Sequence, residues 1–386
     1  MSTKKVKFPE LSKAEFRKIL ALPQRNEKPL RVVLDTDFNN EVDDYFALSW
    51  LILQEKYPSP NLNKIKLEAI HIAPFSFKSR LDKLLKAYAI YLLPPSQIKP
   101  KQQKILDACI GQIKAILALG ITPLDLAKDP HLNGGINGGI EGSYKGVLTM
   151  CDVMDYSSSK KVFKGATRFM KNASDPVASD AAENLIQLAL SASPEDPIYV
   201  IAIACATNIS SALLINPKIL PNIVIVWDAG YPTNMNKKTN NSLNLDEDIF
   251  ASQLLFSSGV PLVYVPGFYI AQQLSMSKPD LENCYSKAGD IGKLLINRYL
   301  NNPLFSFYGI NPADLFGRSW VIWDLANVSW LLNPNSVGSD LVKAPILTKN
   351  KKWKKNPKGH LIREANAISV NSIFPDFARQ LIKYYG

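Results

Sequence analysis

The sequence of 386 residues predicts an α/β fold with a mostly parallel open sheet flanked by helices. Short runs of β-branched and other apolar residues recur along the chain, and most are followed by a segment whose apolar residues return every three or four positions. Strands buried in parallel sheets are near-continuous apolar runs, and helices usually connect them. Because the two patterns alternate along the chain, a parallel sheet is favoured over separate blocks of strands and helices.

The elements are expected in the following order. The predicted strands are 30–34, 67–72, 197–203, 222–227 and 261–265. The predicted amphipathic helices are 43–57, 208–215 and 247–258. Each of these helices follows one of the strands, as a crossover connection requires.

We expect one domain over residues 1–386, with an N-terminal extension at 1–29, because large α/β enzymes reach this length as one domain with insertions. The pattern changes between 91 and 164, where a Pro-containing segment and a helical stretch at 105–119 precede a Gly-rich run at 133–139. We interpret 91–164 as an insertion or lid. Glycine pairs are compatible with a mobile flap over a site, and the alternative is a segment that only extends the protein surface.

Composition excludes several classes of protein. Hydrophobic residues make up 46% and charged residues 20%, as in globular domains. No apolar run reaches the roughly 18 residues of a membrane span, and the charged N-terminal segment is not a secretory signal. The cysteines are far apart, so neither a disulfide framework nor a zinc site is expected, and a cytoplasmic location follows: Cys109, Cys151, Cys205 and Cys284.

The formal net charge of +11 raises the question whether the protein binds nucleic acid. The densest basic runs lie near the termini, at 4–7 and 349–355, which favours a solvated charged surface. Nucleic acid is therefore an unlikely partner, although the charge leaves a weak RNA affinity open and would attract anionic or phosphorylated compounds.

Four aspartates gather where the first predicted strand meets the first predicted helix. Asp35 and Asp37 follow the strand, and Asp43 and Asp44 open the helix. The crevice at the carboxyl ends of strands is where α/β sheets bind ligands. Four carboxylates so close together repel one another unless a cation neutralises them, and their hard oxygens suit Ca²⁺ or Mg²⁺. Turn and helix capping is the alternative, but it explains one or two acids rather than four.

A haloacid-dehalogenase-type phosphatase is a second interpretation, because that class also has Asp-x-Asp after its first strand. Its second Asp is normally followed by Gly-Thr or a similar pair. Here Phe38-Asn39 follows, and the adjacent pair Asp43-Asp44 comes later. The double acid is the feature that discriminates between the two interpretations.

This arrangement, with Asp-x-Asp closed by Asp43-Asp44 and followed by Ala47-Leu48, resembles the nucleoside hydrolase family. The connecting loop is two residues longer than usual, and its Asn-Glu-Val ending is similar to a bacterial subgroup. Three later segments resemble family motifs in the required order: Cys205-Ala206-Thr207-Asn208, Ser242-Leu243-Asn244-Leu245-Asp246-Glu247-Asp248 and Val321-Ile322-Trp323-Asp324-Leu325-Ala326. The resemblance covers about 30–334.

The resemblance implies hydrolysis of an N-ribosidic bond with Ca²⁺ as cofactor. The calcium ligands implied are Asp37, Asp44, the Thr207 carbonyl and Asp324. Asp43 is the implied base, which takes a proton from the attacking water. The implied substrate-binding residues are Asn244, Asp35, Trp323, Tyr231 and Asn234, and Asp248 is implied to be structural. A nucleoside-like small molecule is the implied partner, and a homodimer or homotetramer the implied assembly.

Four departures affect the substrate side. Ser242 stands where the family has a glutamate that contacts the ribose 5′-hydroxyl, and Trp323 replaces a histidine proposed to protonate the leaving base. An indole N–H is not a general acid at neutral pH. Trp227-Asp228-Ala229-Gly230-Tyr231 replaces Gly-Gly-Asn, so Tyr231 or Asn234 is expected to take the place of a ribose-binding asparagine. An asparagine often found after the second strand is absent from 73–78.

Two further functions stay open beside ordinary nucleoside hydrolysis and phosphatase chemistry. One is an N-glycosidase for a modified or phosphorylated nucleoside, which the Ser242 change and the basic surface favour. The other is a metal- and ribose-binding pseudoenzyme or sensor, which the loss of the base-protonating histidine favours.

Overall fold

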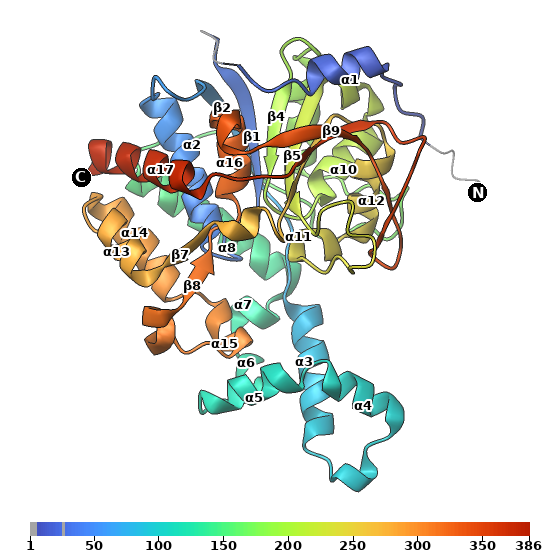
Figure 1. The fold of residues 1–386 in the computed structure, drawn as a ribbon, viewed down its shortest axis with the longest axis vertical. Helices are drawn as coiled ribbons and strands as arrows, with labels where there is room; N and C mark the ends of the chain where they lie inside the picture. Colours follow the sequence, from blue (N-terminus) through green and yellow to red (C-terminus); the bar gives the residue numbers. More distant parts are fainter. Residues whose placement is uncertain (1–5, 25–27) are drawn as a thin grey trace.

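The computed structural model describes residues 6–24 and 28–386. Its centre is an eight-stranded sheet with helices on both faces (Figure 1). The strand order is β3-β2-β1-β4-β5-β6-β12-β9, and every neighbouring pair is parallel except β12 with β9. The strands are β1 (Leu30–Thr36), β2 (Ile65–Ile72), β3 (Val162–Lys164), β4 (Ile198–Ala202), β5 (Ile223–Ala229), β6 (Leu262–Pro266), β9 (Ser339–Lys343) and β12 (Leu361–Ala365). The predicted fold class is confirmed, and the five predicted strands are β1, β2, β4, β5 and β6.

Two helical layers enclose the sheet. One face is covered by α2 (Asp43–Lys56), α8 (Gly135–Val153), α13 (Lys278–Tyr285), α14 (Gly289–Leu300), α16 (Leu325–Leu332) and α17 (Val370–Tyr385). The other is covered by α9 (Asp180–Leu190), α10 (Thr207–Ile215) and α12 (Ile249–Ser257). Successive strand residues point to opposite faces, so Val32 and Leu34 belong to one core and Val33 to the other.

The helices predicted at 43–57 and 208–215 exist as α2 and α10, but they are not amphipathic. Every residue of α2 from Asp43 to Gln54 is buried, because α16 packs beside α2 on the sheet and α17 packs against both helices. The Gln380 side chain of α17 links these layers by donating to Gln54 Oε1 (2.9 Å) and accepting from Trp50 Nε1 (3.2 Å). The face of α2 that the sequence periodicity predicted to be exposed to solvent is therefore buried by other helices.

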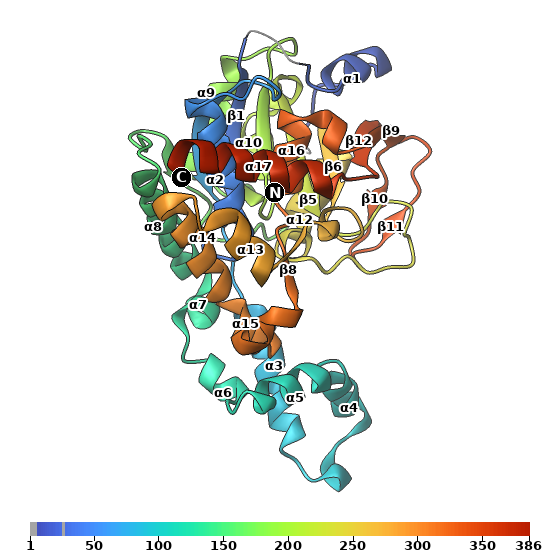
Figure 2. The same cartoon turned by 60° about the vertical axis from the view of Figure 1, so that its left-hand side comes forward.

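Several short helices extend away from the sheet as one projection (Figures 1 and 2). They share a core of their own and are α3 (Lys78–Tyr91), α4 (Pro100–Asp107), α5 (Ile110–Ala118), α6 (Pro123–Leu126), α7 (Pro130–Asn133) and α15 (Leu304–Tyr308). The range 91–164, predicted to be one insertion, is therefore divided. The projection already begins at Lys78, whereas α8 and β3 belong to the main body.

The Gly-rich run expected to be a flap is the end of α7 and the beginning of α8. Glycines at 139, 142 and 146 follow a helical spacing. Gly142 and Gly146 allow α8 to approach the loop after β1, and Gly139 allows it to approach Phe75 after β2. A Cβ atom at Gly142 would lie 2.6 Å from Asn39 Nδ2, and one at Gly146 would lie 2.9 Å from the Phe38 ring. These glycines serve close packing of a helix on the loop.

The remaining elements complete the surface. They are α1 (Lys13–Ile19), α11 (Leu243–Asp246), and the two-stranded sheets β7 (Ser275–Ser277) with β8 (Ser319–Val321) and β10 (Ile346–Leu347) with β11 (Trp353–Lys354). Of the predicted extension 1–29, residues 1–5 and 25–27 lie outside the described residues, and α1 packs Phe16 and Ile19 into the core. None of the described helices is long and apolar enough to cross a membrane.

Candidate active site

A cavity of about 170 Å³ opens at the carboxyl ends of the parallel strands. The chain builds the sheet outward from β1 through β2 to β3, and then in the opposite direction from β4 through β5 to β6. The crevice between β1 and β4 is thus the point where strand order reverses, which is the usual ligand site of an open α/β sheet. The ends of β4, β5 and β6 contribute Ile203, Asp228 and Gly267 to the cavity wall.

The loop after β1 presents three of the predicted acids to this cavity. Asp37, Asp43 and Asp44 all line it and are all buried. The Asn40 backbone N–H donates to the Asp37 carbonyl (2.6 Å), and its side-chain amide donates to Asp37 Oδ2 (2.9 Å). The Thr36 hydroxyl donates to Asp44 Oδ1. Asp43 and Asp44 form the first turn of α2, where the helix dipole favours negative charge.

Asp324 comes from the far end of the sequence and meets these acids at the start of α16. Carboxylate oxygens of Asp43, Asp44 and Asp324 lie within 4.8 Å of one another. The structure therefore brings together two of the predicted metal ligands and the predicted base. Asp37 Oδ1 and Asp228 Oδ2 are also buried at the cavity, and neither has a hydrogen-bond partner among the described residues.

Burial and mutual repulsion disfavour ionisation of this cluster. Burial raises the pKa values of Asp37, Asp43, Asp44 and Asp324 well above the usual range, and neighbouring carboxylates raise them further. Burial also raises the pKa of Asp228 to about 8. Charged carboxylates at such positions need a compensating cation. An all-oxygen donor set with free carboxylate oxygens fits a hard divalent cation, so the cluster can hold a metal ion.

Thr207, the fourth predicted ligand, does not line the cavity. Its side chain is buried at the start of α10, where the hydroxyl donates to Asp248 Oδ2 (2.8 Å). Asp248 also caps α12 by accepting from Ala251 N (3.0 Å), in keeping with its expected structural role. The residue of this segment that lines the cavity is Ile203, at the end of β4.

Asp35 likewise lies below the cavity rather than on its wall. Asp35 is fully buried at the end of β1, and its Oδ2 accepts from the Asn208 side chain (3.0 Å). Burial raises its pKa to about 7. This places Asp35 away from the substrate-binding position expected from the sequence. It also weakens the phosphatase interpretation, which needs Asp35 to reach a substrate.

Asn244 and Trp323 do line the cavity, as expected of substrate-binding residues. The Asn244 amide donates to the carbonyls of Ile203 (3.2 Å) and Asp228 (3.0 Å), which leaves its side-chain oxygen for a ligand. The Trp323 ring meets the ring of Phe268 edge to face, with centroids 6.0 Å apart. Together these two rings form an aromatic wall.

Tyr231 and Asn234 are not among the lining residues. The Tyr231 ring is tilted against the ring of Phe268, with ring centroids 4.5 Å apart, and Asn234 is exposed on the following loop. Asp228, rather than Tyr231 or Asn234, is the residue of this segment that lines the cavity. Asp228 comes directly after the predicted strand at 222–227. Its position at the carboxyl end of a strand could therefore have indicated a place in the site.

Sequence reasoning also missed three side chains that enter the cavity from elsewhere: Glu41, Arg80 and Tyr308. Glu41 belongs to the acidic loop, and its Oε2 accepts from Trp320 Nε1 (3.2 Å). Arg80 and Tyr308 come from α3 and α15, so the base of the helical projection forms part of the wall. No local pattern marks these two residues, because their position depends on how the projection packs.

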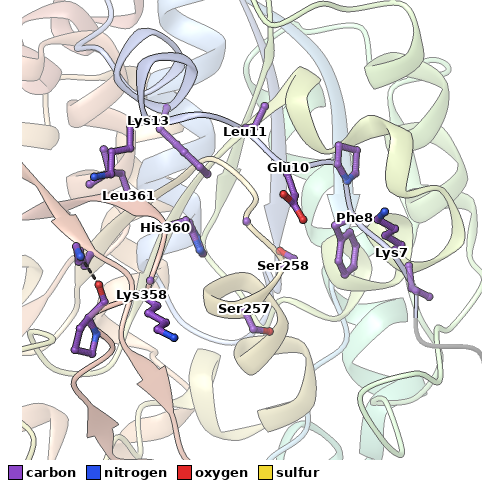
Figure 3. A pocket seen from close by; sticks show the side chains of 17 residues that line it. Lys7, Phe8, Glu10, Leu11, Lys13, Ser257, Ser258, Lys358, His360 and Leu361 are labelled. Carbon is purple, nitrogen blue, oxygen red and sulfur yellow. Dashed lines mark hydrogen bonds between the residues drawn. The ribbon is translucent and has the colours of Figure 1, made fainter.

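A larger cavity, of about 890 Å³, lies between the N-terminal segment and the residues around the starts of β6 and β12 (Figure 3). Its walls include Lys13, Ser258, Lys358 and His360, and among the residues that the structure describes Glu10 is its single carboxylate. This cavity is at the amino-terminal edge of the sheet and lacks the acidic cluster. The smaller cavity at the carboxyl edge is therefore the candidate active site.

Solved structures share this fold over nearly the whole chain. A purine-preferring ribonucleoside hydrolase from Gardnerella vaginalis has a TM-score of 0.59 and 13% identity, covering 92% of this chain and 98% of that one. An inosine-guanosine nucleoside hydrolase has a TM-score of 0.58 and 14% identity, with coverage of 93% and 100%. A plant nucleoside hydrolase has a TM-score of 0.57 and 14% identity, with coverage of 92% and 99%.

No protein-family model and no curated protein matches this sequence. The structural likeness nevertheless covers 92% to 93% of this chain. The chain has the nucleoside hydrolase fold, with an acidic cavity at the switch point of its sheet.

Proposed function

We propose that this protein hydrolyses the N-ribosidic bond of a ribonucleoside or a related ribosyl compound. The observation that carries the proposal is the convergence of Asp37, Asp43, Asp44 and Asp324 at the carboxyl edge of a nucleoside hydrolase fold. Such a cluster suits the oxocarbenium-like transition state of glycoside cleavage, in which positive charge develops at the anomeric carbon.

Calcium is the proposed cofactor, held by Asp37, Asp44 and Asp324. A main-chain carbonyl completes the protein ligands; Thr207 was the residue expected from the sequence, and the cavity wall favours Ile203. Bound calcium would lower the pKa of a coordinated water and fix its position. Roughly six to eight oxygens surround Ca²⁺, which leaves room for water and two ribose hydroxyls.

Asp43 is proposed to accept the proton of the attacking water. Its carboxylate adjoins Asp44 and Asp324, so a water held by those ligands would lie within its reach. Asn244, with its amide committed to two carbonyls, would accept a hydrogen bond from a ribose hydroxyl. Trp323 and Phe268 offer a face and an edge for stacking on the leaving base.

Release of reducing sugar from a panel of ribonucleosides with added calcium tests this function. We expect turnover by the wild type and a 10²- to 10⁴-fold lower kcat for Asp43→Asn, the range typical of losing a general base. Asp290→Asn, an exposed acid paired with Lys293, is the matched control. Absence of turnover on every nucleoside and on 4-nitrophenyl riboside would contradict the proposal.

A ligand-binding protein without turnover is the second candidate function. Two observations favour it. Trp323, whose indole is not a general acid, occupies the position expected for a proton donor, and all three histidines lie outside the cavity. Calcium-dependent ribose binding without hydrolysis would support it. The oligomeric state and the cytoplasmic location expected from the sequence stay predictions.

A further inference from the structure

The wall of the candidate active site has two ends of opposite character. Asp37, Asp43, Asp44 and Asp324 form the acidic end. At the other end, Arg80 is the single cation among the described residues that line the cavity. A ligand that fits both ends must present hydroxyl groups or a cation to the acids and an acceptor or negative charge to Arg80.

The guanidinium of Arg80 is only partly committed. Its Nη2 donates to the Asn241 carbonyl (3.1 Å), its side chain also hydrogen-bonds the Tyr308 hydroxyl, and within the described part of the chain it forms no ion pair within 4 Å. Two acids are close enough for its charge to stabilise theirs, and one oxygen of each is held by another donor. Glu41 Oε2 accepts from Trp320 Nε1 (3.2 Å), and Glu247 Oε1 accepts from Ser76 N (2.7 Å). A partly buried guanidinium has five donors in a planar fork, and that geometry matches phosphate.

Apart from those two acids, the wall next to Arg80 leaves room for an anion. It is formed by Asn241, Ser242 and Leu243, which carry no charge. The Ser242 hydroxyl accepts from the backbone N–H of Gly230 (2.8 Å) and can still donate. The first turn of α3, which carries Arg80, has no acidic residue, and its Lys78 pairs with Asp82 one turn later (3.7 Å). The partial positive charge at the start of this helix adds to that of the guanidinium.

We infer that the substrate is a ribosyl compound with a 5′-phosphate, such as a ribonucleoside 5′-monophosphate, and that Arg80 binds the phosphate. This inference rests on the proposed function, because it takes the acidic end as the site of the ribose hydroxyls. The base would then stack on the aromatic wall of Trp323 and Phe268. Water would add its hydroxyl to C1′ as the C1′–N bond breaks, and its remaining proton would go to the base, yielding free base and ribose 5-phosphate.

Binding of ribose 5-phosphate and of ribose, measured calorimetrically on the full-length protein with calcium, tests the inference without turnover. We expect ribose 5-phosphate to bind roughly 10- to 100-fold tighter, as charge-assisted hydrogen bonds typically give. Equal binding of the two sugars would overturn the inference even if nucleosides are cleaved. Failure of the proposed function would instead appear as no hydrolysis of nucleosides, nucleotides or 4-nitrophenyl riboside.

Variants at position 80 locate the effect. Arg80→Gln should remove most of the preference for ribose 5-phosphate while leaving ribose binding within about twofold, and Arg80→Lys should keep part of it. Lys83→Gln removes a positive charge from an exposed position of the same helix and should keep the whole preference. An equal loss for both sugars in Arg80→Gln would assign Arg80 a structural role and overturn the inference. Inorganic phosphate binding as tightly as ribose 5-phosphate would also overturn it, since the site would then recognise a free anion.

Discussion

The side-chain amide of Asn244 donates to the carbonyl oxygen of Ile203 at 3.2 Å, which ties α11 to the end of β4. The same amide donates to the Asp228 carbonyl (3.0 Å), so one side chain joins the ends of two neighbouring strands. The Asn244 side chain thus holds together the part of the candidate active-site wall formed by Ile203 and Asp228. Helix α11 has only four residues, and this bridge holds it against the sheet.

Replacing Asn244 should therefore affect both stability and function. Asn244→Ala removes two hydrogen bonds, each worth about 1 kcal/mol, and should lower the free energy of unfolding by roughly 1–3 kcal/mol in urea denaturation. Asn244→Asp should be worse, because a carboxylate would face two carbonyls and the acidic cavity. Asn241→Ala, which removes an exposed side chain from the preceding loop, is the control. Equal stability of Asn244→Ala and wild type would show that the bridge contributes nothing.

Calcium should stabilise the folded protein. Because the cation offsets repulsion between buried acids, calcium at about 100 times its Kd should add about 2.7 kcal/mol, seen as a rise in Tm. Asp44→Asn and Asp324→Asn should reduce this calcium-dependent rise, and Asp290→Asn should leave it unchanged. An identical rise in all three variants would place the calcium elsewhere.

The stability of the calcium-free protein should fall as pH rises. Burial raises the pKa of Asp228 to about 8, whereas its value in the unfolded chain is about 3.9. Between those values the folded state binds more protons than the unfolded state, so the free energy of unfolding decreases with pH over about 4 to 8. Denaturation in EDTA across this range should show the decrease.

Asp228→Asn provides the check on that slope. Removing the titrating group should make the decrease of stability with pH less steep. Part of the decrease should remain, because burial also raises the pKa of Asp35, to about 7. Asp280→Asn, on the first turn of α13, serves as the control with the wild-type slope. Stability that rises with pH in the calcium-free protein would contradict the raised pKa of these buried acids.

Local sequence patterns were sufficient to predict five of the eight strands of the sheet and the acidic loop. Strand β1 and the first turn of α2 are each a few residues long, and their apolar runs and paired acids are visible without any knowledge of contacts. The carboxyl-end rule then placed Asp37, Asp43 and Asp44 in one crevice. The convergence of Asp324 was implied by resemblance alone, because 280 residues separate it from Asp44.

What could not be predicted depends on packing between distant segments. Arg80 and Tyr308 reach the cavity because α3 and α15 share the core of the projection, and no periodicity encodes that contact. The case of Thr207 is different, because Thr207 was implied by resemblance of the segment Cys205-Ala206-Thr207-Asn208 to a family motif. The residue that lines the cavity is Ile203, four positions earlier at the end of β4.

The aromatic wall should contribute to recognition of the base. Trp323→Leu removes the ring that meets Phe268 and should raise KM for nucleoside or nucleotide substrates by about 3- to 10-fold, the equivalent of one aromatic pair. Binding of ribose should change little, since ribose has no base to stack. Phe374→Leu, on α17 and outside the cavity, is the control. Weaker ribose binding in Trp323→Leu would mean that Trp323 shapes the sugar site.

Close packing of α8 on the loop after β1 should control the metal site. In Gly146→Ala the new methyl group would begin 2.9 Å from the Phe38 ring and 3.3 Å from the Tyr45 hydroxyl, so the loop that carries Asp37 must shift. We expect calcium affinity, measured by calorimetry, to fall by roughly tenfold while helix α8 stays folded. The matched control is Gly138→Ala on the same helix, where nothing lies within 4 Å of the added Cβ. That variant should keep calcium affinity and gain up to about 1 kcal/mol of stability from helix propensity. If both variants bind calcium like the wild type, the glycine face of α8 does not position the loop.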